Sequence, residues 1–212
     1  MRFCILLILL TFNVKANDSL LVINLPHQIY IEQQFRDAIW IEYSLKSQKN
    51  IEKKLNGIIP PNTAFKIVND STYESPNNLE IYNLMKRFEG GFKLNKVSIS
   101  ESLFKLLNHN NYTRTIIILT KGLTKNYCPN SNHKFYEDEL TELNIYSYVP
   151  SSGKKANLSI EVLIYEKALQ KFIYYQSAGD YGEPLNDKFA IKVLKSSLED
   201  YFLKGPNLKI KP

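Results

Sequence analysis

Hydrophobic residues along this chain form short runs and helical spacings that predict alternating strands and helices. Apolar runs rich in β-branched residues predict strands at residues 19–25, 63–68, 115–119, 143–149, 158–165 and 171–177. Apolar positions three or four residues apart predict helices at residues 32–55, 76–88, 98–107 and 186–203. The run from Ile116 to Leu119 contains no polar residue, which is typical of a central strand covered on both faces.

Turn and capping residues mark where several of these elements begin and end. Ser75 followed by Pro76 is typical of a helix start. Ser98 and Glu101 have the spacing of a capping box, in which the serine and glutamate side chains satisfy free backbone N–H groups. The short connection 166–170 predicts that the last two strands form an antiparallel hairpin. This order of elements predicts an α/β fold, a single domain with a mixed β-sheet covered by helices.

The first sixteen residues have the pattern of a secretion signal. Arg2 is followed by an apolar run over residues 3–12 and by a polar stretch that ends in the small residue Ala16. The run is shorter than the roughly 20 apolar residues that span a bilayer. We therefore predict cleavage after Ala16, which leaves residues 17–212 as one α/β domain with a short basic C-terminal tail. An uncleaved anchor or a buried first strand is the alternative.

Export limits where the mature chain works and what can stabilise it. We predict a periplasmic or secreted protein with no transmembrane anchor after cleavage, because Cys4 lies too early to become the lipid-bearing first residue of a lipoprotein. Cys128 is then the sole cysteine, so an intramolecular disulfide is excluded. Loss of Arg2 and Lys15 lowers the net charge from +6 to +4, which serves solubility or, as the alternative, attraction to acidic surfaces. Nucleic acid is not a predicted partner, because exported proteins rarely meet it.

Thiol chemistry is one alternative that the sequence leaves open. Cys128 and His133 lie five residues apart, and a nearby base can convert a thiol into a nucleophilic thiolate. The chain contains no Gly-rich phosphate loop, no Gly-x-Ser-x-Gly elbow and no His-Glu-x-x-His or paired-cysteine metal motif. The acidic residues within 137–142 lack the alternating spacing of a calcium loop. We therefore predict no catalytic residue, no metal and no cofactor.

The segment 178–187 is the predicted binding site. Its glycines allow backbone conformations that other residues rarely adopt. Asp180 and Glu183 supply hydrogen-bond acceptors, and Tyr181 offers a ring for stacking. The alternative interpretation is a plain connection between a strand and the last helix.

The order of elements from residue 98 onward resembles the small periplasmic α/β domains of the curli-secretion lipoproteins, the penicillin-binding-protein activator lipoproteins and the amino-terminal domain of TolB. The matching pieces are a helix, an apolar strand, a long hairpin and a closing helix, at residues 98–107, 115–120, 158–175 and 186–203. The resemblance implies an envelope protein that binds or regulates others, and it transfers no functional residue.

These observations predict an exported, non-catalytic binding or accessory protein of the cell envelope, whose partner is a protein or another envelope component. The alternatives are a secreted hydrolase or thiol enzyme that uses Cys128 and His133, or a secreted factor that acts on a host or a competitor.

Overall fold

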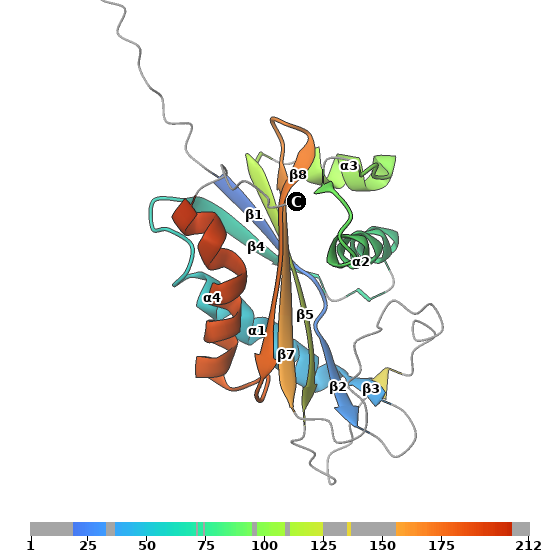
Figure 1. Ribbon diagram of the computed structural model, residues 1–212, viewed down its shortest axis with the longest axis vertical. Coiled ribbons are helices and arrows are strands. Elements are labelled where there is room, and N and C mark those ends of the chain that lie inside the picture. Colours follow the sequence, from blue (N-terminus) through green and yellow to red (C-terminus); the bar gives the residue numbers. More distant parts are fainter. Residues whose placement is uncertain are drawn as a thin grey trace, which may run out of the picture.

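The computed structural model describes residues 19–32, 37–70, 72–73, 75–94, 97–108, 111–124, 135–136 and 156–204 (Figure 1). These residues form eight strands and four helices: β1 (Ser19–Asn24), β2 (Gln28–Glu32), β3 (Asp37–Trp40), α1 (Ile41–Leu55), β4 (Ala64–Asn69), α2 (Pro76–Glu89), α3 (Glu101–Asn108), β5 (Arg114–Thr124), β6 (Phe135–Tyr136), β7 (Asn157–Glu166), β8 (Lys171–Tyr181) and α4 (Asp187–Lys204). The predicted strand over residues 143–149 and the basic tail lie outside the described residues.

Strand β5 is the centre of one mixed sheet. On one side, β1 pairs in parallel with its first half and β2 with its second half, so that Leu20 lies opposite Arg114 and Gln28 opposite Lys121. On its other side β7 runs antiparallel along its length, and β8 pairs with β7 as the predicted hairpin. Strand β4 extends the sheet beyond β1, and β3 and β6 extend it beyond β2.

Helices cover both faces of this sheet, α1 and α4 on one face and α2 and α3 on the other (Figure 1). Side chains alternate between the two faces along β5: Ile116 and Ile118 pack with α1 and α4, while Ile117 and Leu119 pack with α2 and α3. All four are at most 1% exposed. The predicted α/β fold with a helix-covered mixed sheet and a central apolar strand is therefore confirmed.

The helix predicted over residues 32–55 is wrong in its first part, because Glu32 ends β2, residues 37–40 form β3 and α1 begins at Ile41. Ile29 and Tyr30 are both buried, the first in the core under α1 and α4 and the second in the core under α2 and α3. Adjacent residues that point into opposite cores require an extended backbone. The second half of β5, longer than predicted, pairs with β2, and β2 in turn pairs with residues 37–39 of β3, which the sequence predicted as helix.

Helix caps are partly as predicted. Ser75 caps α2, since its side chain accepts a hydrogen bond from the N–H of Asn78, and Pro76 begins the helix. The capping box predicted from Ser98 and Glu101 is wrong. Ser100 caps α3 by accepting from the N–H of Leu103, and the carboxylate that bonds the N–H of Ser100 belongs to Glu80 on α2. The packing of α2 against α3 brings the carboxylate of Glu80 to the position that the sequence pattern predicted for the carboxylate of Glu101.

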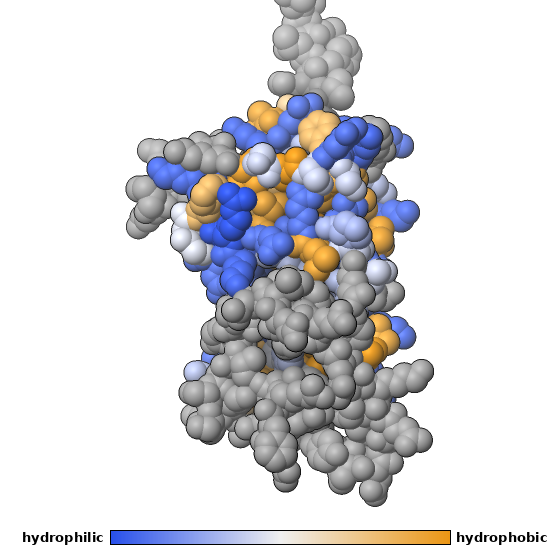
Figure 2. All heavy atoms as spheres, turned by 90° about the vertical axis from the view of Figure 1, so that its right-hand side faces the viewer, coloured by the Kyte–Doolittle hydropathy of each residue, from blue (hydrophilic) through white to orange (hydrophobic). Residues whose placement is uncertain are grey.

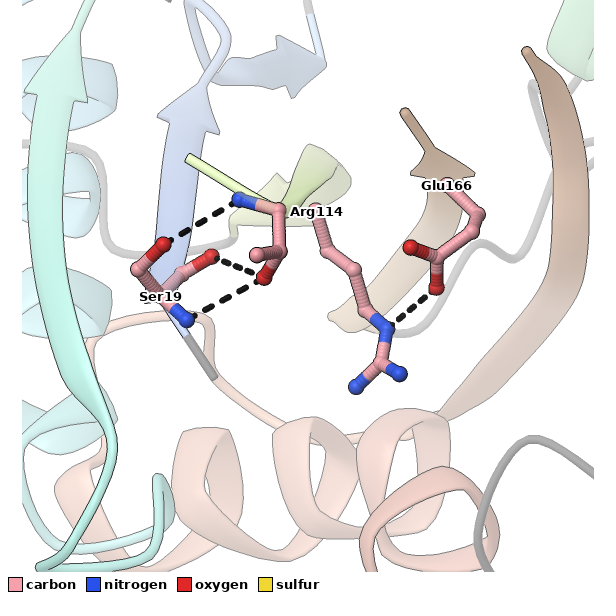
Figure 3. Close-up of polar contacts among 4 residues, drawn as sticks. Ser19, Arg114 and Glu166 are labelled. Carbon is pink, nitrogen blue, oxygen red and sulfur yellow. Dashed lines mark hydrogen bonds and ion pairs between the residues drawn. The ribbon is translucent and has the colours of Figure 1, made fainter. Parts of the chain in front are cut away.

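Hydrogen bonds and an ion pair connect the start of β1, the start of β5 and the end of β7 (Figure 3). Ser19 at the start of β1 exchanges backbone and side-chain hydrogen bonds with Thr113, the residue before β5. Arg114 and Glu166 lie opposite each other on β5 and β7, and Arg114 Nε is 2.5 Å from Glu166 Oε2. These contacts hold β1, β5 and β7 together at one end of the sheet.

A buried polar cluster fills the break between β1 and β2. His27 Nδ1 lies 2.9 Å from Ser47 Oγ, and its Nε2 lies 3.1 Å from Asn24 Oδ1. The amide of Gln48 donates to the carbonyl oxygens of Asn24 and Leu25, where the strand pairing is interrupted. Burial lowers the pKa of His27 to about 3, so the ring is neutral at physiological pH.

Candidate functional site

A hollow of about 320 Å³ lies on the α2/α3 side of the sheet, beside the C-terminal end of α2. Strands β5, β7 and β8 form it together with the last residue of α2. Its lining consists of Glu89, Lys121, Asn157, Leu158, Ser159, Glu161, Ser177, Gly179, Asp180 and Tyr181. We refer to this feature as the sheet hollow.

The sheet hollow arises from a change of side-chain type along single strands. In β7, Leu163 and Tyr165 face the core under α2 and α3, whereas Glu161 and Ser159, two and four residues earlier on the same face, are polar. Strand β8 changes in the same way, from the ring of Tyr175 to the small residues Ser177 and Gly179. An apolar face covered by helices therefore continues into a polar, concave one.

A buried ion pair forms the floor of the sheet hollow. Lys121 Nζ lies 2.6 Å from Glu161 Oε1, with side chains only 16% and 4% exposed. The hydroxyl of Tyr175 donates to the other carboxylate oxygen at 3.0 Å. The pKa of Tyr175 is raised, first by burial and then by the negative charge of Glu161, so this hydroxyl keeps its proton. Each carboxylate oxygen thus has a protein partner, as a buried charge requires.

Further polar groups surround this floor. Ser159 lies directly opposite Lys121 on β5 and opposite Gly179 on β8, so its hydroxyl is central on this face. Ser177 is exposed and lies opposite Glu161. Glu89 contributes a carboxylate from the exposed end of α2. The sheet hollow therefore presents both hydrogen-bond donors and acceptors within one small concavity.

The predicted binding residues are divided between two sides of the sheet. Asp180 and Tyr181 line the sheet hollow, and they belong to β8 rather than to the predicted loop. Tyr181 is 65% exposed. The carboxylate of Asp180 accepts a hydrogen bond at 2.7 Å from Lys192 of α4, on the other side of the sheet, and this bond is the first cause of its lowered pKa.

Glu183 is turned away from the sheet hollow. Its carboxylate accepts hydrogen bonds from the hydroxyls of Tyr43 on α1 and Thr124 at the end of β5. Tyr43 belongs to the core under α1 and α4, on the opposite side of the sheet. The contacts of Glu183 tie the β8–α4 connection to α1 and β5.

The sequence-based candidates for catalysis and metal binding, Cys128, His133 and the acidic residues within 137–142, lie outside the described residues. Among the residues that the structure describes, no three His, Cys, Asp or Glu side chains form a group that could hold a metal ion. Sequence analysis missed Lys121, Ser159 and Glu161. The signal that could have found them is the appearance of polar residues at alternate positions of strands that are otherwise apolar.

Apolar side chains also reach the surface on the α2/α3 side. Figure 2 shows hydrophobic residues between hydrophilic ones on this side of the molecule. Phe92 and Leu106 are 42% and 40% exposed, and the guanidinium of Arg87 lies over the ring of Phe92 at 4.2 Å. Single exposed apolar side chains of this kind are ordinary on protein surfaces and define no docking site.

Comparisons with protein-family models and with curated proteins found no match. Solved structures to which the chain is similar include a PelC dodecamer from Paraburkholderia phytofirmans, with 6% identity over 86% of this chain and 87% of that chain and a TM-score of 0.33. A neuraminyllactose-binding hemagglutinin homolog from Helicobacter pylori has 7% identity over 89% of this chain and 81% of that chain, with a TM-score of 0.32. Lipoprotein GNA1162 from Neisseria meningitidis has 9% identity over 91% of this chain and 99% of that chain, with a TM-score of 0.34. Likenesses this distant assign neither a family nor a function.

Proposed function

We propose that this chain is an exported, non-catalytic binding or accessory protein of the cell envelope, and that it binds its ligand or partner in the sheet hollow. The observation that carries the proposal is the preformed polar floor of the sheet hollow, where Lys121, Glu161 and Tyr175 are fixed by mutual hydrogen bonds. Ligand sites in proteins are concave, and a small number of precisely placed polar groups in them fix the orientation of the ligand.

The state of these polar groups favours binding over bond cleavage. Glu161 is engaged through both oxygens, and Tyr175 keeps its proton, so neither offers an unengaged base. Within the described ranges, no hydrogen bond joins the hydroxyls of Ser159 or Ser177 to an acid or base that would activate them.

Export is supported by the position of the first strand. Strand β1 begins at Ser19, so cleavage after Ala16 would leave the whole sheet in the mature chain. No helix in the described ranges is both long and apolar enough to cross a membrane. Periplasmic and secreted locations are both compatible with the proposal.

Site-specific photo-crosslinking in the native host tests the proposal. A photoreactive residue is placed at position 177, in the sheet hollow, and in a matched variant at position 196, which is exposed on α4. Cell fractionation is expected to find chains that begin at Asn17 outside the cytoplasm. Irradiation is expected to give an adduct at position 177 and none at position 196.

Three outcomes would overturn the proposal. Chains that keep residues 1–16 and remain in the cytoplasm contradict export. Equal adducts at both positions, or none at position 177, contradict binding in the sheet hollow. Chemical conversion of the captured molecule by the purified chain, lost on substitution of a residue of the sheet hollow, contradicts a non-catalytic role.

A further inference from the structure

We infer that the ligand of the sheet hollow is a neutral polyhydroxylated compound of the saccharide class. This inference rests on the proposed function, because it assumes that the sheet hollow is the binding site. Charge, hydrogen-bonding capacity and shape each support it.

The charges in the floor of the sheet hollow cancel, because Lys121 is neutralised by Glu161. The carboxylate of Asp180 adds no charge there, because it pairs with Lys192 of α4 on the other side of the sheet. Glu89 leaves one negative charge, at an exposed position where water screens it. An anionic ligand would be repelled by the carboxylate of Glu89, and Lys121 is already paired with Glu161. A strongly cationic ligand would lie against the ammonium group of Lys121. A neutral polar ligand avoids both costs.

Donors and acceptors are interspersed over the floor and walls. Lys121 has three N–H donors, of which the ion pair with Glu161 uses one. Each oxygen of Glu161 can accept a further hydrogen bond beside the one from Lys121 or Tyr175. The hydroxyls of Ser159 and Ser177 can donate and accept. Ligand hydroxyl groups, which also do both, can satisfy this mixed set.

The shape of the sheet hollow also fits one or two sugar rings. Its volume of about 320 Å³ is at the lower end for small-molecule sites. Gly179 helps to keep it open, because a side chain there would begin 3.4 Å from Ser159 Cβ and extend over the floor. The exposed ring of Tyr181 stands at the border, where a flat aromatic face can cover the apolar face of a sugar.

A glycan array followed by titration calorimetry tests this inference on the processed chain. Probes are neutral di- to tetrasaccharides, sulfated and carboxylated saccharides, and spermidine. Neutral saccharides are expected to bind, and Gly179→Leu is expected to weaken binding at least about tenfold by filling the sheet hollow. Ser177→Val removes one hydroxyl and is expected to cost roughly three- to tenfold. Gln176→Leu, on the opposite face of the same strand, is the matched control and is expected to change nothing.

The results separate this inference from the proposed function. Binding of spermidine or of anionic saccharides alone overturns the neutral-saccharide assignment, as does an array without any bound probe. Binding that Gly179→Leu and Ser177→Val leave unchanged, while circular dichroism shows folded variants, also overturns it. An adduct at position 177 in cells together with an empty array would leave the proposed function standing and remove only the ligand class.

Discussion

Ser19 and Thr113, 94 residues apart in sequence, are joined by hydrogen bonds in both directions. The N–H of Ser19 donates to Thr113 Oγ1 at 3.1 Å, and Thr113 Oγ1 donates to the carbonyl of Ser19 at 2.9 Å. The N–H of Thr113 contacts both the carbonyl and the hydroxyl oxygen of Ser19, at 3.0 and 3.1 Å. This contact fixes the first residue of β1 beside β5, and removal of residues 1–16 leaves it in place.

Thr113→Val should therefore destabilise the mature chain. The substitution keeps the β-branched shape but removes the hydroxyl that donates to Ser19 and accepts from it. Loss of two part-buried hydrogen bonds predicts a decrease of about 1–3 kcal/mol in the free energy of unfolding, measured by urea denaturation. Thr113→Ser retains the hydroxyl and should lose less than half as much. Equal losses in the two variants would show that the methyl group, not the hydroxyl, matters.

Glu183→Ala should reduce stability and leave ligand binding intact. The carboxylate of Glu183 accepts hydrogen bonds from Tyr43 and Thr124 on the side of the sheet away from the sheet hollow. Its removal leaves these two hydroxyls without that acceptor, which predicts a loss of about 1–3 kcal/mol in the free energy of unfolding. Crosslinking at position 177 should be unchanged. Reduced crosslinking in a variant that remains folded would restore Glu183 as a binding residue.

Most of the fold could be predicted because its signals are local. The unbroken run Ile116–Leu119, the Ser75 cap and the short turn between β7 and β8 each act over a few residues. Predictions failed where distant residues decide the structure. Residues 37–40 form a strand instead of the predicted helix because β2 pairs with them, and α3 is capped by Ser100 because Glu80 of α2 reaches it.

The sheet hollow depends on register, which the sequence alone does not specify. Lys121 meets Glu161 because β5 and β7 pair with Lys121 opposite Ser159, which makes Glu161 its diagonal neighbour. A shift of β7 by one residue against β5 would move Glu161 to the other face of the sheet and separate it from Lys121. The predicted site residues Asp180 and Tyr181 lie at its border, but Glu183, close in sequence, points to the opposite side.

Substitutions of Lys121 and Glu161 should be strongly non-additive. Either Lys121→Met or Glu161→Leu alone leaves a buried charge without its partner, which predicts a loss of about 3–5 kcal/mol in the free energy of unfolding. The double variant removes both charges and should be within about 1–2 kcal/mol of the wild type, since packing replaces the pair. Urea denaturation of the four proteins gives the coupling energy. Additive losses would show that water, rather than the partner, solvates these charges.

Stability should fall as the pH drops through the range in which His27 remains neutral only in the folded chain. Burial lowers the pKa of His27 from 6.5 to about 3, so between these values the unfolded chain binds a proton that the folded chain does not. The contribution of His27 is complete above pH 6.5 and is lost at about 1.4 kcal/mol per pH unit below it. From pH 7 to pH 5 the expected loss from this residue is about 2 kcal/mol.

His27→Asn isolates this effect in urea denaturation at pH 7 and pH 5. The variant should be less stable at pH 7, because it disturbs the contacts of His27 with Ser47 and Asn24. Its stability should nevertheless depend less on pH, so the difference from the wild type should shrink by about 2 kcal/mol at pH 5. Ser47→Ala removes one contact but leaves the imidazole buried, and it should keep the wild-type slope. Parallel slopes in the wild type and His27→Asn would mean that His27 is protonated in the folded chain, contrary to its burial.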